Sequence, residues 1–388
     1  MEICVTSASG IEAVTKRELY KIIGKEDLSA INGRIKFEGD ESDVAKCNLN
    51  LRTGNRVEIV LGGFKAETFD DLFDGIKAIP FEEYISRDGK IIVNAKSVQS
   101  KLFAYSAIQS VSKKAICERL CKKFGVNELN ESGARYKIEV AALKDYVTVT
   151  LDTSGDGLHR RGYRGLVGEA PLKETLAAAL VELSVWNKTR PFADLFCGTG
   201  TIPIEACMIA LNIPAGLNRG FDFQNWKCFD KKIFDRAAEE AKANIVTDAD
   251  LRIGGFDIDD KQLKLARKHA ELAGVDKYIH FQRADMRDFS SRFSHGVIIS
   301  NPPYGERLSD RKEVEKLYRD YGKKVASLDD WCAYTLTPVD DFERLFGKKA
   351  NKKRKIYNGK IECCYYSHLA PPPEKAISPA IRGTAAIP

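Results

Sequence analysis

Asn301, Pro302, Pro303 and Tyr304 are the residues of this 388-residue chain whose types and order most clearly predict a chemistry. They directly follow an apolar stretch, 297–300, that has the composition of a buried strand. Two prolines stiffen the turn and prevent a helix from starting at once, so the preceding carbonyl groups point outward. The amide oxygen of Asn301 and the carbonyl of Pro302 can then accept protons from one exocyclic amino group, and Tyr304 can stack on the ring. The motif predicts a site for a nucleobase amine.

A second group of residues has the features of a nucleoside site. Segment 194–201, Asp-Leu-Phe-Cys-Gly-Thr-Gly-Thr, lies between a strand-like and a helix-like stretch. Gly198 and Gly200 permit a sharp turn close to a ligand, and the helix N-terminus offers free N–H groups. Asp257 ends the next strand, where a carboxylate can accept both ribose hydroxyl protons, and Asp285 follows the third strand. Each acidic residue alone is also typical of an N-cap or turn, but three at successive strand ends favour a binding site.

A parallel sheet is needed to bring these residues together. After a basic hinge at 159–164, His-Arg-Arg-Gly-Tyr-Arg, strand-like and helix-like stretches alternate. This alternation is typical of a parallel sheet with helices on both faces. We expect strands at 192–196, 253–257, 279–283, 296–300 and 331–336, and helices at 201–211 and 261–273. The Asn358-Gly359 pair between strand-like runs predicts a final hairpin over 353–368.

The first 164 residues have the pattern of two small α+β units. Residues 1–55 contain a strand-like start, an amphipathic run at 11–23 and a short strand at 33–37. In the second unit we expect strands at 56–61, 90–95, 136–142 and 146–152, and helices at 69–78 and 106–124. The last helix carries five basic residues, mostly on one side, which fit either a solvated face or a nucleic-acid surface.

Composition and charge exclude several classes of protein. The chain is 44% hydrophobic and 30% charged, so it can bury cores and is neither disordered nor collagen-like. No apolar run approaches the ~20 residues that cross a bilayer, and the first residues lack a secretory signal, so we expect a cytoplasmic protein without a membrane partner. The ten cysteines and five histidines lack metal-ligand spacing, which predicts free thiols and no metal. A net charge of +6 is compatible with a polyanionic partner.

These motifs together resemble a known family. Residues 165–370 resemble a class I methyltransferase that uses S-adenosylmethionine, and Asn301–Tyr304 match the motif of enzymes that methylate exocyclic amines of nucleobases. The N-terminal part resembles the ferredoxin-like plus THUMP module of RNA-modifying enzymes. The whole chain, including segments 170–174, 214–219 and 357–363, is similar to bacterial 23S rRNA guanine-N2 methyltransferases, in a form with a single methyltransferase module.

The resemblance implies a fold, a division into domains and a reaction. The fold class is α/β: a Rossmann-like methyltransferase with a seven-stranded sheet and helices on both faces, preceded by the α+β ferredoxin-like and THUMP module. The implied domains are a ferredoxin-like unit at 1–55, a THUMP RNA-binding domain at 56–164, the methyltransferase domain at 165–370 and a flexible tail at 371–388. The implied product is N2-methylguanosine, and rRNA is favoured over tRNA as the partner.

The resemblance also implies roles for individual residues. The methionine end of the cofactor would be surrounded by Asp194, Phe196, Gly198 and Gly200, its ribose would be held by Asp257, and its adenine by Asp285 and Met286. Asn301, Pro302, Pro303 and Tyr304 would hold the target base. The RNA would be gripped by Arg160, Arg161, Arg164, Lys348, Lys349, Lys352, Lys353 and Arg354, although the last five also fit a solvated loop.

Three other functions remain open at this point. THUMP modules also occur in tRNA enzymes, so a tRNA guanine-N2 methyltransferase is one alternative. The Asn-Pro-Pro-Tyr motif also serves DNA adenine-N6 methylation, and a non-catalytic RNA-binding assembly factor would keep the cofactor site only as a scaffold. The aromatic-rich insert at 221–226 either shapes the substrate side or packs against the neighbouring helix.

Overall fold

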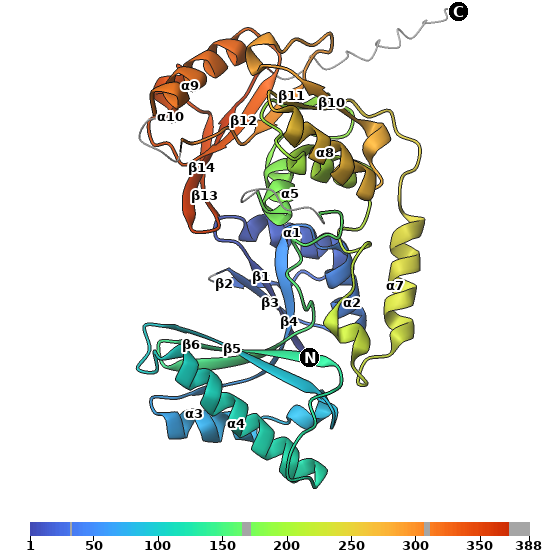
Figure 1. The fold of residues 1–388 in the computed structure, drawn as a ribbon, viewed down its shortest axis with the longest axis vertical. Helices are drawn as coiled ribbons and strands as arrows, with labels where there is room; N and C mark the ends of the chain where they lie inside the picture. Colours follow the sequence, from blue (N-terminus) through green and yellow to red (C-terminus); the bar gives the residue numbers. More distant parts are fainter. Residues whose placement is uncertain (32, 165–171, 306–310, 372–388) are drawn as a thin grey trace, which may run out of the picture.

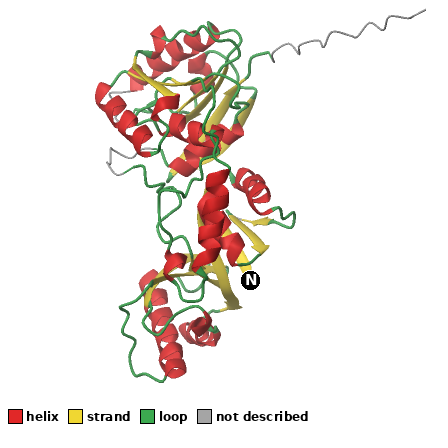
Figure 2. Ribbon diagram, turned by 90° about the vertical axis from the view of Figure 1, so that its right-hand side faces the viewer, coloured by secondary structure: helices red, strands yellow, loops and turns green. Residues whose placement is uncertain are grey.

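The computed structural model describes residues 1–31, 33–164, 172–305 and 311–371. Figures 1 and 2 show an elongated molecule in which the catalytic part, from residue 172 on, lies at one end. Residues 66–152 lie at the other end, and the first 50 or so residues lie between them (Figure 1). Nearly all of the predicted tail at 371–388, and the first two residues of segment 170–174, lie outside the described residues. Within the described ranges no helix is both long enough and apolar enough to cross a bilayer.

The catalytic part contains a seven-stranded sheet, as predicted. Its strands are β8 (Phe192–Asp194), β9 (Ile253–Asp257), β10 (Ile279–Arg283), β11 (Val297–Ser300), β12 (Cys332–Thr337), β13 (Lys352–Asn358) and β14 (Ile361–His368). The strand order is β10-β9-β8-β11-β12-β14-β13, and the first five strands of this order are parallel. Strands β13 and β14 form an antiparallel hairpin at one edge. The predicted alternation of strands and helices and the predicted final hairpin are therefore confirmed.

Helices cover both faces of this sheet. They are α5 (Glu174–Leu183), α6 (Thr201–Ala210), α8 (Asp260–Leu272), α9 (Arg311–Ala326) and α10 (Phe342–Phe346). Helix α7 (Lys231–Ala243) instead packs against the core of the N-terminal part. The helices α5, α6 and α8 share one hydrophobic core with Val297 and Ile299, whereas α9 and α10 share another with Ile298. Because neighbouring residues of a strand point to opposite faces, the three apolar residues that begin β11 supply both cores.

The N-terminal 152 residues form one continuous sheet rather than two separate ones. Its strands are β1 (Glu2–Ser7), β2 (Ser29–Ile31), β3 (Arg34–Glu38), β4 (Gly54–Lys65), β5 (Lys90–Val98), β6 (Arg135–Leu143) and β7 (Tyr146–Asp152). The order is β2-β3-β1-β4-β7-β6-β5. Strand β4 is twelve residues long, and it pairs with β1 near its start and with β7 further along. The sequence predicted only its middle, 56–61, because the two glycines at 62 and 63 look like the end of a strand.

Four helices cover one face of the N-terminal sheet, two for each unit. Helices α1 (Glu12–Ile23) and α2 (Glu41–Asn50) belong to the first unit, and α3 (Phe69–Ala78) and α4 (Tyr105–Phe124) belong to the second. The buried residues of α2, α3 and α4 join one core with alternate residues of β4, β6 and β7. The opposite face of the sheet is largely polar, and it carries the side chains of Arg34, Glu58 and Glu139.

The insert at 221–226 packs against the N-terminal sheet. Trp226 stacks on Tyr136 of β6 with the ring centroids 5.0 Å apart, and its Nε1 donates to the carbonyl of Arg135 over 2.9 Å. The Arg135 guanidinium forms an ion pair with Asp222 at 2.7 Å. Helix α7 follows and packs against α2, and Figure 1 shows it descending from the catalytic part to the middle of the molecule. The insert therefore clamps the two parts together.

Arg161 is deeply buried at this junction, with 1% of its surface exposed. Its guanidinium donates to the carbonyls of Leu158, Leu51 and Arg52, the last two of which belong to the loop after α2. It also faces the carboxylate of Glu205 on α6, with nitrogen to oxygen distances of 3.4 Å. The hydroxyl of Tyr163 donates to the same carboxylate over 3.0 Å. This network ties the first unit to the helix that follows the glycine turn.

We expect Glu205→Ala to lower the free energy of unfolding by about 3–5 kcal/mol, because it leaves the buried Arg161 charge without its counter-ion. Denaturant unfolding followed by circular dichroism measures this change. The matched control is Asp156→Ala, which breaks the exposed Arg160–Asp156 pair and should cost at most about 1 kcal/mol. Equal losses in the two variants would show that the buried pair contributes no more to the free energy of unfolding than the exposed pair does.

Candidate active site

The predicted nucleoside and amine motifs meet at one edge of the catalytic sheet. Strands β10, β9, β8 and β11 are neighbours, and parallel strands place their carboxyl ends at the same edge. Asp194 and Asp257 are the last residues of β8 and β9, and Asn301 directly follows β11. A cavity of about 780 Å³ opens at this edge. Of the predicted residues it is lined by Phe196, Asp257, Asp285, Met286, Asn301 and Pro303.

The glycine turn between β8 and α6 is held in place by Asp257. Gly198 and Gly200 both have positive φ, 51° and 81°, which explains why glycine stands at these positions. A Cβ on Gly200 would lie only 3.0 Å from the ring of Phe281. The Gly198 N–H donates to Oδ2 of Asp257 over 2.8 Å, and the Asp259 N–H donates to Oδ1 over 2.9 Å. Asp257 therefore acts as a structural clamp and also lines the cavity.

Asp194 lies beneath the cavity rather than in its wall. The side chain is 1% exposed, and its Oδ1 accepts from the N–H of Phe196 over 3.1 Å. Burial raises the pKa of this carboxyl to about 7, because a charged carboxylate loses its hydration there and the negative charge of Asp257 adds to the effect. The structure therefore holds Asp194 close to the turn but gives it no direct access to the cavity.

Asp285 caps a short helix and also lines the cavity. It is the N-cap of a short 3₁₀ helix, Met286–Asp288, and its Oδ1 accepts from the Arg287 N–H over 2.9 Å. Its second oxygen forms an ion pair with the Arg287 guanidinium at 2.7 Å. The residue nevertheless lines the cavity beside the buried Met286. Capping and ligand binding are compatible here because a carboxylate has about four acceptor sites.

The Asn301–Gly305 turn separates this cavity from a second one of about 570 Å³. Asn301 and Pro303 line the first cavity, whereas Tyr304 lines the second. The Tyr304 hydroxyl donates to Oδ1 of Asn301, and burial raises the pKa of Tyr304 to about 12, so the phenol stays a neutral donor. Pro302 is buried. Gly305 and Val314 line both cavities, and Asn301 lines the first while it is hydrogen-bonded to Tyr304, which lines the second.

Residues of α8 and α9 complete the first cavity, and sequence reasoning did not find them. They are Gln262 from the first turns of α8 and Glu313, Val314, Lys316 and Leu317 from α9. A helix that follows an acidic strand end must begin near the same sheet edge, so the sequence could have predicted Gln262 as a lining residue. No sequence pattern predicted the lining residues of α9. Their position depends on the buried Tyr318, whose hydroxyl donates to the Pro303 carbonyl over 3.1 Å.

Two of the three hinge arginines point into the protein, although the sequence predicted that all three contact RNA. For Arg161 that prediction is wrong, because the side chain is buried and all of its bonds are internal. Arg164 also points inward: it forms an ion pair with Glu174 at 3.1 Å and donates to the hydroxyls of Thr199 and Thr201 in the glycine turn. Arg160 is exposed and, among the residues that the structure describes, pairs only with Asp156, so it stays a candidate contact.

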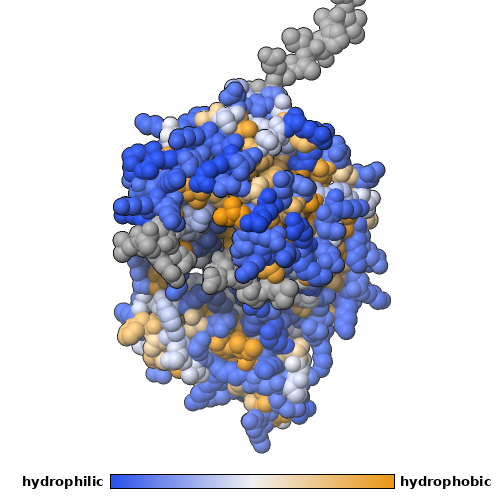
Figure 3. All heavy atoms as spheres, turned by 45° about the horizontal axis from the view of Figure 1, so that its top comes forward, coloured by the Kyte–Doolittle hydropathy of each residue, from blue (hydrophilic) through white to orange (hydrophobic). Residues whose placement is uncertain are grey.

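The C-terminal basic run lies on the surface before and within β13. Lys353 forms an ion pair with Glu343, and the Arg354 guanidinium donates to the carbonyl of Gly10 over 3.1 Å. Lys348, Lys349 and Lys352 are exposed and have no ion pair within the described part of the chain. The end of the molecule that carries the catalytic part is mainly hydrophilic, with smaller hydrophobic areas between the polar residues (Figure 3). The three lysines remain the best candidates of this run for phosphate contacts.

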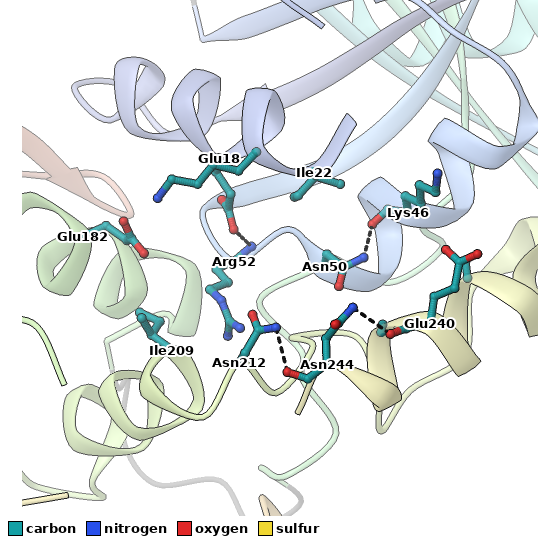
Figure 4. Close-up of a pocket in the computed structure, with 13 residues that line it drawn as sticks. Glu18, Ile22, Lys46, Asn50, Arg52, Glu182, Ile209, Asn212, Glu240 and Asn244 are labelled. Atoms are coloured by element: carbon teal, nitrogen blue, oxygen red, sulfur yellow. Dashed lines mark hydrogen bonds between the residues drawn. The ribbon is translucent and has the colours of Figure 1, made fainter. Parts of the chain in front are cut away.

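Another cavity, of about 540 Å³, lies where α1 and α2 meet α5, α6 and α7 (Figure 4). Arg52 lies inside this junction, and its Nη2 donates to the Ile213 carbonyl over 2.8 Å. Glu18 accepts from the backbone N–H of Arg52 over 2.6 Å, and burial raises its pKa. None of the predicted site residues lines this cavity, so it belongs to the domain junction. The described residues contain no cluster of three or more His, Cys, Asp or Glu side chains suited to a metal ion.

Comparison with known protein families divides the chain into three segments. Residues 161–367 match the family described as "RMKL-like, methyltransferase domain". Residues 2–58 match the "RlmL ferredoxin-like domain", and residues 66–152 match the "THUMP domain". The methyltransferase match includes Arg161 and Tyr163, whose side chains bond to Glu205 of that domain.

Individual proteins are similar over nearly the whole chain. A Bacillus subtilis (strain 168) protein named "Putative RNA methyltransferase YpsC" is 44% identical, over 94% of each chain. A "Ribosomal RNA large subunit methyltransferase K/L" from Syntrophotalea carbinolica is 32% identical over 92% of this chain but only 52% of its own length. The chain therefore spans about half the length of that relative.

Two solved structures have the same overall arrangement. One, described as a "putative methyltransferase complexed with SAH", is 42% identical with a TM-score of 0.91, over 96% of this chain and 98% of its own. The other, from Listeria monocytogenes, is described as a "predicted N6-adenine-specific DNA methylase" and is 44% identical with a TM-score of 0.90, over 95% of this chain and 96% of its own. Both descriptions name methyl transfer, and only the second names a nucleic acid.

The buried Asp194 predicts that folding stability depends on pH. Its pKa rises on folding from 3.8 to about 7, so between these values the unfolded chain releases a proton that the folded chain keeps. The contribution of Asp194 to stability therefore falls as the pH rises through this window. We expect Asp194→Asn, which keeps an acceptor for the Phe196 N–H, to raise Tm more at about pH 8 than at about pH 4, a gain on the order of a few kcal/mol.

Thermal unfolding at the two pH values measures this difference. Asp156→Asn removes an exposed carboxylate and is the matched control, so its effect on Tm should be small at both pH values. The same gain for Asp194→Asn at both pH values would mean that the buried carboxyl does not titrate in this window.

Proposed function

Because this chain belongs to the RMKL-like methyltransferase family, with ferredoxin-like and THUMP domains before the catalytic domain, we propose that it methylates an exocyclic amine of RNA with S-adenosylmethionine. The proposed product is N2-methylguanosine, and we favour 23S rRNA over tRNA because relatives at 32% identity are named as ribosomal RNA large subunit methyltransferases. An enzyme with this substrate would act in the cytoplasm, where ribosomes assemble.

The lining of the first cavity supports S-adenosylmethionine as the cofactor. The cavity combines apolar side chains, Phe196 and Met286, with carboxylates at two strand ends. Apolar surfaces suit an adenine ring, and the Asp257 carboxylate, although clamped by two backbone N–H groups, has acceptor sites left for ribose hydroxyls. When bound, S-adenosylmethionine supplies a methyl group made electrophilic by its sulfonium.

Asn301 carries the proposal, because it lines the first cavity and accepts a hydrogen bond from Tyr304, which lines the second. The exocyclic amine of guanine is a poor nucleophile, since its lone pair is delocalised into the ring. Acceptors on its protons favour a pyramidal nitrogen whose lone pair is free to attack, and positioning then contributes much of the acceleration. The bond from the Tyr304 hydroxyl fixes the orientation of the Asn301 amide and leaves its oxygen a second lone pair for the substrate.

Tyr304 supports the same proposal from the other side of the turn. Its ring lines the second cavity, so a base that stacks on this ring can place its amine at Asn301. A base inside a helix cannot reach such a place, and the target is therefore expected in a loop or flipped out of its stack. The Tyr318 hydroxyl holds the Pro303 carbonyl and keeps the turn in this position.

One experiment can identify both the nucleic acid that the protein methylates and the base that it modifies. Mass spectrometry of nucleosides from the RNA of a deletion strain should show the loss of N2-methylguanosine, and complementation should restore it. Loss of N6-methyladenosine from DNA would instead support the DNA adenine alternative, which the motif and the description of the Listeria structure both favour. Unchanged nucleosides in both RNA and DNA would favour a non-catalytic assembly factor.

Variants of the Asn301–Tyr304 turn should affect the chemical step. We expect Asn301→Ala to lower the methylation rate by about 10²-fold or more, because it removes one of the acceptors that orient the amine. Tyr304→Phe keeps the stacking ring and should retain most activity, whereas Tyr304→Ala loses stacking worth about 1–3 kcal/mol and should be severely impaired. Single-turnover methylation of purified rRNA measures the rates, and calorimetry with S-adenosylmethionine checks that cofactor affinity is unchanged. A wild-type rate in Asn301→Ala would make this residue purely structural.

The C-terminal lysines should contribute to RNA affinity through counterion release. We expect the triple change of Lys348, Lys349 and Lys352 to alanine to reduce the slope of log affinity against log salt by roughly two to three. Lys353→Ala is the control, because its charge is already paired with Glu343. Filter binding of labelled rRNA at several salt concentrations measures both slopes. An unchanged slope in the triple variant would show that these lysines are only a solvated face.

A further inference from the structure

The second cavity, which Tyr304 lines, has a wall that the proposed function does not use. The loop between β12 and α10 forms this wall with residues 338–341. Arg311 and Glu315 of α9 and Arg344 of α10 also line the cavity, and these two helices lie side by side (Figure 1). The cavity therefore combines an aromatic ring with charged side chains of both signs.

Among the described residues, three carboxylates line this cavity, and two of them are already paired with arginines. Oε2 of Glu315 lies 2.9 Å from Nη2 of Arg319, and Oδ2 of Asp341 lies 2.8 Å from Nη2 of Arg344. The third carboxylate belongs to Asp340, which is exposed. Its side chain forms neither an ion pair nor a hydrogen bond with any other residue that the structure describes.

A capping role does not account for Asp340. An aspartate at the start of a helix ordinarily accepts a hydrogen bond from an N–H of the first turn. The N-cap residue of α10 is Asp341, whose side chain forms no cap bond, and Asp340 lies one residue further from the helix. Because no described residue bonds to the Asp340 carboxylate, its acceptor sites are open to a ligand in the cavity.

A chain of hydrogen bonds holds this loop against the Asn-Pro-Pro-Tyr turn. The Val339 N–H donates to the Thr337 hydroxyl over 3.2 Å, and the hydroxyl oxygens of Thr337 and Tyr318 lie 2.9 Å apart. The Tyr318 hydroxyl donates to the Pro303 carbonyl, so it accepts the proton of Thr337. The Tyr318 ring also packs edge-on against Phe342, the first residue of α10. The turn and the loop that line the second cavity are therefore held at a fixed spacing.

An acceptor in this loop can distinguish guanine from adenine. Guanine carries an N1–H donor beside its exocyclic N2 amine, whereas adenine has a bare N1 acceptor beside its N6 amine. A carboxylate offers only lone pairs, so it binds the N1–H of guanine and repels the N1 of adenine. The Asn-Pro-Pro-Tyr turn binds an amine of either base. The choice between the two bases therefore requires another residue.

The charges around Asp340 also fit a nucleotide that enters the cavity. A free carboxylate by itself repels the phosphates of an approaching RNA. The guanidinium groups of Arg311 and Arg344 line the same cavity and are largely exposed, so they can neutralise the phosphates that flank the base. A base that covers the Asp340 carboxylate also excludes water from it, which strengthens a hydrogen bond at this place.

We propose that Asp340 makes this enzyme select guanine, by accepting the N1–H of the base whose N2 amine lies at Asn301. This inference rests on the proposed function, because it requires that an RNA base enters the second cavity and stacks on Tyr304. It assigns the choice between guanine N2 and adenine N6 to a residue outside the Asn-Pro-Pro-Tyr motif.

Methylation of 23S rRNA with one altered base tests the proposal. Splint ligation places either guanosine or 2,6-diaminopurine riboside at the nucleotide that a deletion strain leaves unmethylated. 2,6-Diaminopurine keeps the N2 amine but has a bare N1. We expect the wild type to methylate the guanosine RNA about 10- to 100-fold faster in single turnovers, the value of one charge-assisted hydrogen bond. In Asp340→Asn this preference should nearly vanish, because an amide can accept from N1–H or donate to a bare N1.

The matched control is Asp341→Asn, which removes the neighbouring carboxylate that is paired with Arg344 and should keep the wild-type preference. An unchanged preference in Asp340→Asn, including equal slowing on both RNAs, would overturn the inference while guanine-N2 methylation stands. Equal wild-type rates on the two RNAs would do the same. Failure of the wild type to form N2-methylguanosine in the guanosine RNA would overturn the proposed function as well. Asp340 is exposed, so its variant should fold, which circular dichroism checks.

Discussion

The buried guanidinium of Arg161 is the constraint on which the arrangement of the domains depends. A charge that is 1% exposed must have acceptors, and the chain provides them from the loop after α2, from Leu158 and from Glu205 on α6. Helix α6 begins directly after the glycine turn, so the contact that joins the domains is also a support of the first cavity. A shift of the N-terminal unit would break the bonds from this guanidinium to the carbonyls of Leu51 and Arg52.

Two of the acidic residues at the strand ends form structural hydrogen bonds and still line the first cavity. Asp257 bonds to two backbone N–H groups and Asp285 caps a short helix, yet both line the cavity. Such bonds hold a carboxylate in position before a ligand arrives, so little order is lost on binding. Asp194, by contrast, forms only the structural bond and does not line the cavity. Its burial raises its pKa to about 7, and its position beneath the turn makes it a support rather than a wall.

The contacts between the N-terminal sheet and the catalytic domain fix the distance between the places where an RNA could bind. Strand β4 runs through both N-terminal units, and the insert with Trp226 attaches the catalytic domain to the same sheet. The separation between the first cavity and the far end of the sheet is therefore set by packed elements rather than by a linker. Under the proposed function, an RNA that contacts both places would be recognised by its shape as well as by its charge.

The sequence by itself predicted the class of fold, most strands of the catalytic sheet and the motifs at its edge, because apolar periodicity, glycine pairs and the Asn-Pro-Pro-Tyr turn act locally. It also assigned Arg161 to RNA, and the structure contradicts this. A basic hinge looks the same whether it faces phosphate or a buried carboxylate, and Glu205 is 44 residues away in the chain. Only the tertiary structure decided which charges are free, that β4 joins two units into one sheet, and that α9 completes the cavity. Each of these depends on packing between segments that are far apart in sequence, which no local pattern records.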